Sequence, residues 1–338
     1  MNLEGRRVAV TGGAGFIGSH LVDRLAALGN RITVVDNFAT GTEENLALHR
    51  DSGRVRIVHG DVRRVGDLQA AFEGAEVVLH LATHCVRLSL SEPATNHEVN
   101  ATGTLNALKA AKDAGVRRFI YCSSSEVYGN AFAQGGLLSE ESPRRPTTIY
   151  GASKLAGEHY TIVYHQTYGL ECTVVRPFNT YGPRAHLLGP YGEVIPRFAV
   201  WIRAGRSPVI LGDGLQTRDF TYVEDTAASI VAAAECDALL GDSVNIARGE
   251  EVSILALART LSEIEEKPFA PIYAEGRPGD IRRLGADVGK YRRLVGVPPS
   301  TPLREGLGRY LLWLENQSPD YEKLAKALSE RNWLENPC

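Results

Sequence analysis

The sequence predicts an α/β fold in which a doubly wound parallel sheet carries a smaller C-terminal lobe. Three observations lead to this prediction. Short apolar runs alternate with amphipathic helical segments, the first run leads into a glycine-rich turn, and the alternation stops after Arg176. Strands and helices that alternate in this way form parallel sheets covered by helices on both faces. With 338 residues, the chain is long enough for a large unit and a second, smaller one.

Six apolar runs have the length of buried strands and are rich in β-branched residues. They lie at Val8–Val10, Ile32–Val35, Val55–Val58, Val77–Leu79, Phe119–Cys122 and Cys172–Val175. Segments with the apolar spacing of a helix fall between them, as at Leu21–Leu28 and Thr104–Ala114. We therefore expect residues 1–176 to form the sheet domain.

The stretch after Arg176 is rich in residues that interrupt regular structure: Pro177, Gly182, Pro183, Gly189, Pro190, Gly192 and Pro196. Such a stretch predicts a long functional loop region. Beyond it we expect a strand at Val209–Leu211, a helix after Val223, a strand near Val244–Ile246, a helix from Ser253 and a helical tail. Residues 177–338 should mainly form the smaller lobe over the carboxyl edge of the sheet, with some chain crossing back to the sheet.

Composition argues against several classes of protein. Lys and Arg total 37 against 40 Asp and Glu, so the formal charge is -3 and no basic surface for nucleic acid is expected. The five cysteines show no paired spacing for disulfides or a zinc site. The first apolar run begins by Val8, without a charged leader or a long hydrophobic stretch before it. We expect a cytoplasmic protein with no membrane segment and no metal.

The first predicted strand runs into the turn Thr11-Gly12-Gly13-Ala14-Gly15-Phe16-Ile17-Gly18. Glycine permits the tight turn, and the missing side chains let a pyrophosphate approach the amides at the N-terminus of the next helix. A glycine turn alone is a weak signal, because many such turns hold no ligand. Its position between a strand and a helix predicts a dinucleotide site.

Asp36 ends the second predicted strand, where a carboxylate can accept hydrogen bonds from both hydroxyls of a ribose. The same carboxylate would repel a 2′-phosphate, and the neighbouring Asn37 is not basic. NAD is therefore expected rather than NADP. A helix cap or turn residue is the alternative for Asp36. Asp61, after the third strand, either meets the adenine amino group or is a turn residue.

Tyr150 and Lys154 lie one helical turn apart at the start of a predicted long helix, so the phenol and the ammonium share a face. A phenol, with a reference pKa of about 10, is a poor base at neutral pH. A lysine cation favours the phenolate, and a serine such as Ser124 at the end of the preceding strand can hold the reacting oxygen. We expect Tyr150 to take the proton of a sugar hydroxyl group while the carbon that carries this group gives its hydride to nicotinamide.

The order of glycine turn, serine and Tyr-x-x-x-Lys resembles that of the extended short-chain dehydrogenases, the NAD-dependent epimerase/dehydratase family of nucleotide-sugar enzymes. The resemblance covers nearly the whole length and implies a Rossmann domain. Its further motifs are Asp61-Val62, His80-Leu81-Ala82, Glu98-Val99-Asn100-Ala101-Thr102-Gly103-Thr104, Glu126-Val127-Tyr128-Gly129, Arg176-Pro177-Phe178-Asn179-Thr180-Tyr181-Gly182-Pro183-Arg184, Gly212-Asp213-Gly214, Arg218-Asp219-Phe220 and Arg277-Pro278-Gly279-Asp280.

The resemblance also implies which residues contact the ligands. The residues implied for NAD are Gly12, Gly15, Phe16, Ile17, Gly18, Asp36, Asn37, Asp61, Val62, Leu81, Ala82, Tyr150, Lys154 and Pro177. Those implied for the substrate are Arg87, Asn179, Val194, Arg218 and Arg277. Asn179, Arg218 and Arg277 would hold the diphosphate, a role that suits two guanidinium groups and an amide. Alternatively, Arg218 and its neighbour Asp219 form a surface ion pair.

Glu126 bears most on which reaction of the family is expected. By resemblance, 4-epimerases usually carry a small or uncharged residue there, because they rotate the 4-keto sugar and return the hydride. Dehydratases carry Glu, which removes the C5 proton, and nucleotide-sugar decarboxylases also show a Ser-Glu pair. In many dehydratases an Asp precedes this Glu and acts as the acid for the departing C6 hydroxyl group. Here the position is Ser125, as in dehydratases similar to those for GDP-mannose. A buried acid paired with an arginine is the structural alternative.

We therefore expect transient C4 oxidation of a nucleotide hexose, with 4,6-dehydration favoured and Ser124, Ser125, Glu126, Tyr150 and Lys154 as catalytic residues. An epimerase like UDP-glucose 4-epimerase is the alternative, followed by a UDP-glucuronate decarboxylase. Against dehydration stand the serine at 124, where dehydratases tend to have Thr, and an isoleucine at 149 in place of a frequent Pro. The catalytic set argues against a sensor without chemistry, and the diphosphate residues argue against a dehydrogenase of small alcohols.

The resemblance further implies an isologous homodimer. The helix of Tyr150 and the helix at Thr104–Ala114 carry apolar faces that would meet their symmetry mates. By the same resemblance, Leu284 falls near a position that gates the C2 substituent of the sugar.

Overall fold

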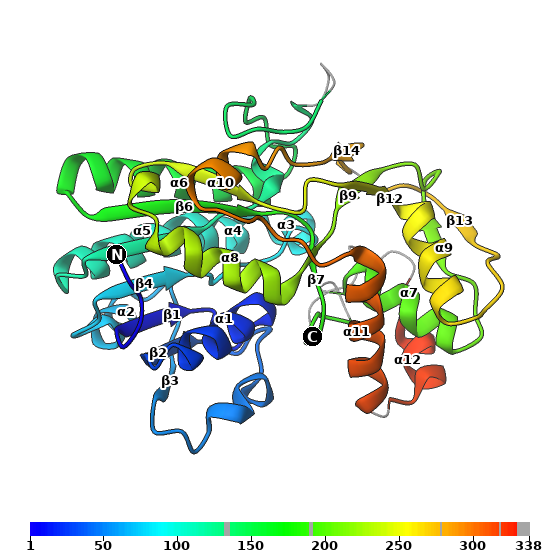
Figure 1. Ribbon diagram of the computed structural model, residues 1–338, viewed down its shortest axis with the longest axis horizontal. Coiled ribbons are helices and arrows are strands. Elements are labelled where there is room, and N and C mark those ends of the chain that lie inside the picture. Colours follow the sequence, from blue (N-terminus) through cyan, green and yellow to red (C-terminus); the bar gives the residue numbers. More distant parts are fainter. Residues whose placement is uncertain (132–135, 189–191, 278, 318, 330–338) are drawn as a thin grey trace.

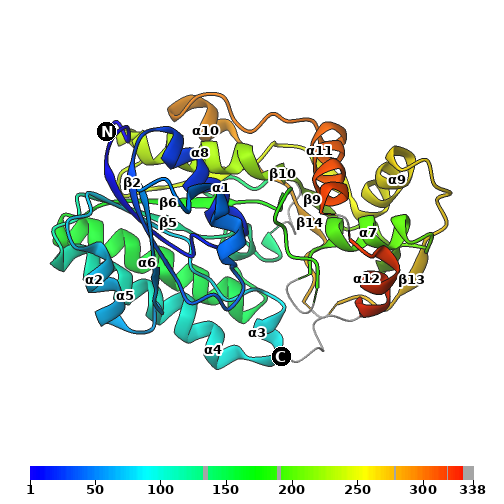
Figure 2. The same cartoon turned by 90° about the horizontal axis from the view of Figure 1, so that it is seen from below.

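Seven parallel strands form the central sheet of the protein, and helices cover both of its faces (Figures 1 and 2). The computed structural model describes residues 1–131, 136–188, 192–277, 279–317 and 319–329. Gly189, Pro190, Pro278 and Cys338 lie outside these described residues. The strands are β1 (Arg7–Thr11), β2 (Arg31–Asp36), β3 (Val55–His59), β4 (Val77–His80), β5 (Arg118–Cys122), β6 (Glu171–Pro177) and β11 (Ser243–Ile246). The predicted fold class and its six strands are confirmed.

The spatial order of the strands is β11-β6-β5-β4-β1-β2-β3. The chain winds outward from β1 in one direction and from β4 in the other, so a crevice opens between the carboxyl ends of these two strands. Ligands of doubly wound sheets bind at such a switch point. The glycine turn begins at Gly12, directly after β1, and Leu81 follows β4 across this crevice.

Three helices lie on one face of the sheet and a larger group lies on the other (Figure 2). The first group is α1 (Phe16–Ala27), α8 (Val223–Glu235) and α10 (Gly289–Leu294). The second is α2 (Val65–Phe72), α3 (Leu88–Ser91), α4 (Pro93–His97), α5 (Gly103–Asp113) and α6 (Ile149–Tyr168), with the π-helical turn η2 (Glu98–Thr102). Each face has its own apolar core, because the strands are buried on both sides.

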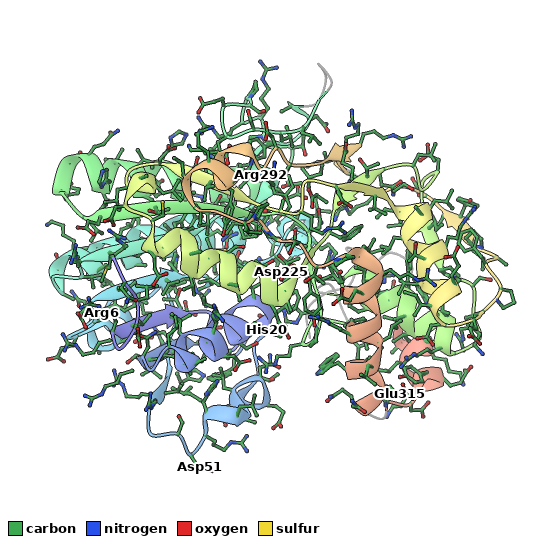
Figure 3. The ribbon with its side chains drawn as sticks, in the orientation of Figure 1. Arg6, His20, Asp51, Asp225, Arg292 and Glu315 are labelled. Carbon is green, nitrogen blue, oxygen red and sulfur yellow. The ribbon has the colours of Figure 1, made fainter. Side chains whose placement is uncertain are left out.

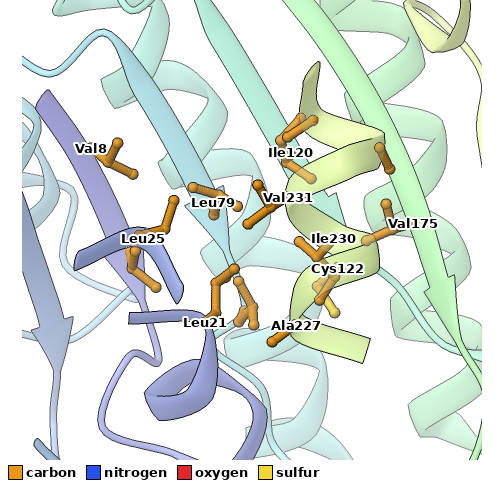
Figure 4. Packing of buried hydrophobic residues seen from close by; sticks show 14 of the residues in the cluster. Val8, Leu21, Leu25, Leu79, Ile120, Cys122, Val175, Ala227, Ile230 and Val231 are labelled. Atoms are coloured by element: carbon orange, nitrogen blue, oxygen red, sulfur yellow. The ribbon is translucent and has the colours of Figure 1, made fainter. Parts of the chain in front are cut away.

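One expectation about the second half of the chain is wrong. We predicted that the helix after Val223 and the strand near Val244–Ile246 would form part of the smaller lobe. The helix, α8, instead packs on a face of the sheet, and the strand, β11, forms one edge of the sheet. Figure 4 shows Ala227, Ile230 and Val231 of α8 packed against the sheet beside α1. β11 pairs with β6 through Val244 and Val175, and so covers backbone groups that a free edge of β6 would expose.

The smaller lobe lies to one side of the sheet, beyond the carboxyl ends of the strands (Figure 1). Its helices are α7 (Val194–Arg203), α9 (Ile254–Ile264), α11 (Leu303–Asn316) and α12 (Tyr321–Ala327). Its short strands are β8 (Val209–Leu211), β9 (Thr217–Asp219), β12 (Glu251–Ser253), β13 (Ile272–Ala274) and β14 (Arg283–Leu284). The remaining short elements are β7 (Thr180–Tyr181), β10 (Thr221–Tyr222), η1 (Glu43–His49), η3 (Ser125–Val127) and η6 (Asp237–Leu239).

Polar contacts from α1 and α8 tie this lobe to the sheet. His20 of α1 and Asp225 of α8, both labelled in Figure 3, lie near the junction of the two parts. The His20 ring is 2.9 Å from the carbonyl oxygen of Pro183, and Asp225 accepts hydrogen bonds from the amides of Ser300 and Thr301. In the described ranges, no helix combines the length and apolar character needed to cross a membrane.

The closest approach of α1 to the glycine turn gives a test of this packing. A Cβ atom at Gly18 would lie 2.0 Å from the carbonyl oxygen of Gly12, which is backbone and cannot swing away. We expect Gly18→Ala to lower the free energy of unfolding by about 2 kcal/mol, as overpacking does. Urea denaturation measures this change.

Gly66→Ala is the matched control, because Gly66 also lies in the first turn of a helix but a Cβ there meets no atom within 4 Å. Alanine at this position should leave stability unchanged or raise it by up to about 1 kcal/mol. Equal losses in the two variants would contradict a specific contact between Gly18 and Gly12.

Candidate functional site

A cavity of about 1050 Å³ opens at the carboxyl edge of the sheet and continues into the smaller lobe. Every residue that we predicted for the cofactor, the substrate or catalysis lines this cavity. These residues come from strand ends, from the glycine turn, from α6 and from the lobe. The structure therefore brings together positions that are up to 265 residues apart in the chain, from Gly12 to Arg277 (277 − 12 = 265).

The glycine turn is shaped for close approach to a ligand. Gly12 has a φ of +69°, and a Cβ there would lie 2.7 Å from the amide nitrogen of Ala82. Gly15 is the N-cap of α1, and the first turn of this helix contains no acidic residue. The positive end of the helix therefore carries no acidic residue of its own, which fits the pyrophosphate of a dinucleotide.

Asp36 and Asp61 line the part of the cavity beside this turn. Asp36 accepts hydrogen bonds from the amides of Ala14 and Phe38, both at 2.9 Å, while burial raises the pKa of its carboxyl group. Asp61 accepts a hydrogen bond from the side chain of Asn37 and forms an ion pair with Arg63 at 2.7 Å. Hydrogen bonds from Arg63 hold the pKa of Asp61 well below its usual range.

Asp61 also accepts a hydrogen bond from the amide of Arg63, as Asp36 does from Phe38. Both carboxylates therefore bond to the backbone two residues ahead, as turn residues do, and both line the cavity. The two uses that we considered for each residue are compatible. An aspartate held by its own turn has a fixed direction, and a fixed carboxylate costs less entropy to engage with a ribose hydroxyl.

Tyr150 and Lys154 occupy the first turns of α6. Thr148 caps this helix, its hydroxyl accepting a hydrogen bond from the amide of Gly151 at 3.1 Å. The Lys154 ammonium donates to the carbonyl oxygen of Cys122 at 2.9 Å and lies 6.0 Å from the centre of the Tyr150 ring. Burial lowers the pKa of Lys154 to about 8.

The protein's own groups do not by themselves lower the pKa of Tyr150, and the lowering that we expect relies on Lys154 together with an oxidised nicotinamide ring. Burial raises this pKa, and hydrogen bonding with Ser124 opposes the rise only in part. The Lys154 ammonium is held by the carbonyl group of Cys122 and lies over the face of the Tyr150 ring. An oxidised nicotinamide ring adds positive charge when it is bound, and such charge favours the phenolate.

Glu126 lies in the short turn η3, whose N-cap Ser124 accepts a hydrogen bond from the Glu126 amide at 3.2 Å. Its side chain is half-buried because one side faces the cavity. Burial raises the pKa of this carboxyl group, and the charges of Arg277 and Arg218 oppose the rise. No hydrogen bond or ion pair joins the carboxyl group to another described residue. The direct pair with an arginine that the structural alternative requires is not formed among the described residues, although the charges of Arg277, Arg218 and Arg87 act on this carboxyl group.

The predicted diphosphate residues converge on one wall. Arg218 is buried, and both it and Arg277 donate to the same oxygen of Asp280 at 2.7 Å. The side-chain oxygen of Asn179 is buried and meets no partner among the residues described. The expected alternative for Arg218, a surface pair with Asp219, is wrong. Asp219 instead accepts hydrogen bonds from backbone amides.

Arg87 and Val194 complete the predicted substrate residues, and the structure adds Glu193 beside them. Burial raises the pKa of Glu193 to about 7, while the charge of Arg87 opposes this rise. Glu193 therefore changes its charge near neutral pH within the cavity. Sequence reasoning missed it because none of the family motifs contains this position. Glu193 is the N-cap of α7, but its side chain makes no cap hydrogen bond.

Two residues that the resemblance singled out, His80 in a motif and Leu284 near the expected C2 gate, do not line the cavity. The His80 ring bridges the hydroxyl groups of Thr11 at 2.7 Å and Thr104 at 3.1 Å, and burial lowers its pKa to about 3. Leu284 is buried in an apolar cluster with Val127. Within the described ranges there is no group of three or more His, Cys, Asp or Glu side chains that could hold a metal.

A sequence model of the NAD dependent epimerase/dehydratase family matches residues 8–247. The chain belongs to the NAD-dependent epimerase/dehydratase family. The family resemblance that the motifs predicted is thereby confirmed, and with it NAD as the cofactor. The protein is an enzyme of this family. The glycine turn and the N-terminus of α1 suit the pyrophosphate of NAD, and Asp36 suits its ribose.

Relatives in this family catalyse different reactions. UDP-glucose 4-epimerase of Mycolicibacterium smegmatis is 36% identical over 92% of this chain and 99% of its own length. UDP-N-acetyl-alpha-D-glucosaminuronate decarboxylase of Bacillus cytotoxicus is 33% identical over 93% of this chain and 99% of its own. The crystal structure of DesIV, a dTDP-glucose 4,6-dehydratase of Streptomyces venezuelae with NAD bound, has a TM-score of 0.88 at 31% identity, covering 94% and 99% of the two chains.

We expect the protein to bind NAD at least about a hundredfold more tightly than NADP, because a 2′-phosphate beside the Asp36 carboxylate places like charges in contact. Isothermal titration calorimetry with the protein freed of nucleotide measures both dissociation constants. Asp36→Asn should bring the two dissociation constants closer together, because it weakens the binding of NAD and leaves the binding of NADP unchanged. Equal affinities in the unaltered protein would contradict the role of Asp36.

Proposed function

We propose that this protein is a nucleotide-sugar 4,6-dehydratase, which oxidises C4 of a nucleotide hexose, eliminates water across C5 and C6, and returns the hydride to C6. The observation that supports this proposal is the Glu126 carboxyl group, which lines the cavity beside Ser124 without a partner among the described residues. A carboxyl group withdrawn from water costs free energy unless it is paired or serves a function.

In this mechanism Tyr150 takes the proton of the C4 hydroxyl while Ser124 holds the same oxygen, and Lys154 supplies positive charge beneath the ring. NAD, when bound, would supply the hydride acceptor for C4 and later return the hydride to C6. A 4-keto group makes the C5 proton acidic, so Glu126 can remove it and pass a proton to the C6 hydroxyl group, which leaves as water beside the Ser125 hydroxyl group on the same turn. Glu126 then takes a proton from solvent and gives it to C5 as C6 receives the hydride. General acid–base steps of this kind contribute about 10²- to 10⁴-fold each.

The two parts of the chain divide the ligands between them in this proposal. Residues 1–176 form the NAD-binding domain with the catalytic residues, and residues 177–338 mainly form the substrate lobe, apart from α8, β11 and α10. The nucleotide sugar would place its diphosphate at Asn179, Arg218 and Arg277. The remaining substrate residues, Arg87 and Val194, lie on the cavity wall.

A 4-epimerase is the second candidate. Its support is the 36% identity to UDP-glucose 4-epimerase of Mycolicibacterium smegmatis and the serine at position 124. An epimerase shares the C4 oxidation with the dehydratase but then rotates the keto sugar and returns the hydride to C4. A decarboxylase is a third candidate, supported by the similarity to the Bacillus cytotoxicus enzyme. The three reactions differ in the fate of the keto sugar.

Incubation with NAD and with UDP-, dTDP-, GDP- and CDP-glucose in deuterated buffer tests the proposal. Dehydration should lower the product mass by one water and place solvent deuterium at C5, as read by mass spectrometry and NMR. We expect Glu126→Gln to lower product formation by at least about a hundredfold, because the base is lost. Transient NADH absorbance should persist in this variant, since C4 oxidation does not use Glu126.

Tyr150→Phe is the paired variant, and it should remove both the product and the NADH signal while NAD binding persists. An isomer of unchanged mass, formed equally fast by the Gln variant, would establish the epimerase instead. Loss of carbon dioxide from UDP-glucuronate, with no reaction of the four glucose nucleotides, would establish the decarboxylase.

We further propose that the protein is a cytoplasmic homodimer. Four cysteines are free in the described ranges, which suits a reducing compartment. Leu105 of α5 and Val163 and Tyr168 of α6 are exposed large hydrophobic residues on the helices that we expect to pair. Apolar residues gathered on neighbouring helices favour a contact between copies.

Light scattering at micromolar concentration should therefore give twice the mass of the chain. Val163→Glu should shift the population toward monomer, because a charge at the contact is costly to bury. A monomer for the unaltered protein at this concentration would contradict the dimer.

A further inference from the structure

A buried ion pair lies directly behind the proposed catalytic residues. The guanidinium group of Arg176 donates to both carboxylate oxygens of Glu158, at 2.8 Å and 2.7 Å. Their side chains are only 1% and 5% exposed. Removing two charges from water costs several kcal/mol per ion, and apolar side chains of similar volume often pack equally well. The charges therefore need a reason other than packing.

The pair contacts the elements that carry the catalytic groups. Ser123, at the end of β5, donates its hydroxyl hydrogen to Glu158 at 2.6 Å and directly precedes the orienting serine. Glu158 itself lies one helical turn after Lys154 on α6. Arg176 directly precedes Pro177, which ends β6 and lines the cavity. One ion pair thus joins β5, α6 and β6 behind the site.

The same network reaches the segment of Glu126. Arg176 also donates to the hydroxyl oxygen of Tyr128 at 2.8 Å, and Tyr128 donates to the side-chain oxygen of Asn245 on β11 at 2.7 Å. Tyr128 is the C-cap of η3, the turn that holds Glu126. Movement of Arg176 would therefore release the end of this turn.

Glu158 also sets the charge around Lys154. The titratable groups near this lysine come from four elements: His80 on β4, Tyr121 and Cys122 on β5, Tyr150 and Glu158 on α6, and Arg176 on β6.

Most of these groups are neutral near pH 8. Burial lowers the pKa of His80 to about 3 and raises that of Cys122 to about 11, and it raises the pKa values of both tyrosines. Glu158 is therefore the one anion among these six groups. Its charge raises the pKa of Lys154, against the burial that lowers it to about 8.

We propose that Glu158 and Arg176 are positioning residues of the reaction. They hold Ser124, Lys154 and Pro177 in fixed positions relative to one another, and Glu158 keeps Lys154 charged. This inference rests on the proposed function for the roles of these three residues. It goes beyond that function because neither Glu158 nor Arg176 lines the cavity. Both act through other side chains.

The test is Glu158→Gln, which keeps the size of the side chain and removes its charge. A lysine whose pKa is lowered loses its proton at lower pH, so activity that needs the cation should disappear earlier as pH rises. We expect the basic limb of the kcat profile, where activity falls as Lys154 loses its proton, to move to lower pH by about 1 pH unit, because the charge that raises this pKa is removed. NAD-loaded enzyme is assayed with UDP-glucose and dTDP-glucose. Glu158→Asp, which restores the charge, should return the limb toward its original position.

Glu171→Gln is the matched control. Glu171 at the start of β6 pairs with the buried Arg118 at the start of β5 at 2.7 Å, at the end of the strands away from the cavity. The Glu171→Gln substitution should destabilise the protein without moving the basic limb of its kcat profile. A Glu158→Gln enzyme with lowered activity and an unmoved limb would overturn the proposal, because a structural role alone predicts that result.

Two further measurements keep the proposal testable. If Glu158→Gln does not fold, the double variant Glu158→Gln with Arg176→Gln avoids an unpaired buried guanidinium group. Because this variant also removes the opposing charge of Arg176, a smaller shift in the same direction is expected. If neither nucleotide sugar is turned over, side-chain ¹⁵N NMR of Lys154 in the NAD-bound protein reports its pKa directly. A fall in that pKa supports the role of Glu158 even where the proposed reaction fails, and an unchanged pKa overturns it.

Discussion

The parallel register of β1, β4 and β5 is the constraint on which the site depends. Thr11, His80 and Tyr121 lie side by side in this register, so the residues that follow each strand emerge at one edge of the sheet. The His80 ring fixes the alignment by bridging Thr11 and Thr104 inside the protein. A slip of one residue would turn the side chains of a strand to the opposite face and separate the glycine turn from the catalytic serine.

Much of this arrangement could be predicted from the sequence, because its signals are local. Strand-length apolar runs, the glycine turn and the pair of Tyr150 and Lys154 are each contained in a few residues. The partners of buried charges are not local, so the link from Arg218 to Asp280, the role of Glu193 and the raised pKa of Tyr150 could not be foreseen. The placement of α8 and β11 was missed for the same reason, since the edge that a strand joins is decided by distant pairing.

The ambiguity between three reactions has a physical origin. Epimerases, dehydratases and decarboxylases of this family can share one oxidation, and the groups for it come from the sheet edge and α6. The later steps depend on what surrounds C5 and C6 of the keto sugar. In the proposed function these surroundings would include Glu126, and Glu193 is a second carboxyl group in the same cavity. The charge of Arg87 acts on both. A family assignment therefore fixes the first half of the chemistry more firmly than the second.

Asp280 has a consequence for how long a ligand stays bound. One of its oxygens accepts hydrogen bonds from both Arg218 and Arg277, so the two guanidinium groups are held in place before a ligand arrives. The same carboxylate offsets one of their two charges, which weakens their pull on a diphosphate. In the proposed function, substrate and product carry the same diphosphate at these two arginines, and two uncompensated cations would retain both. The shared aspartate thus favours fast exchange of product for substrate over tight retention.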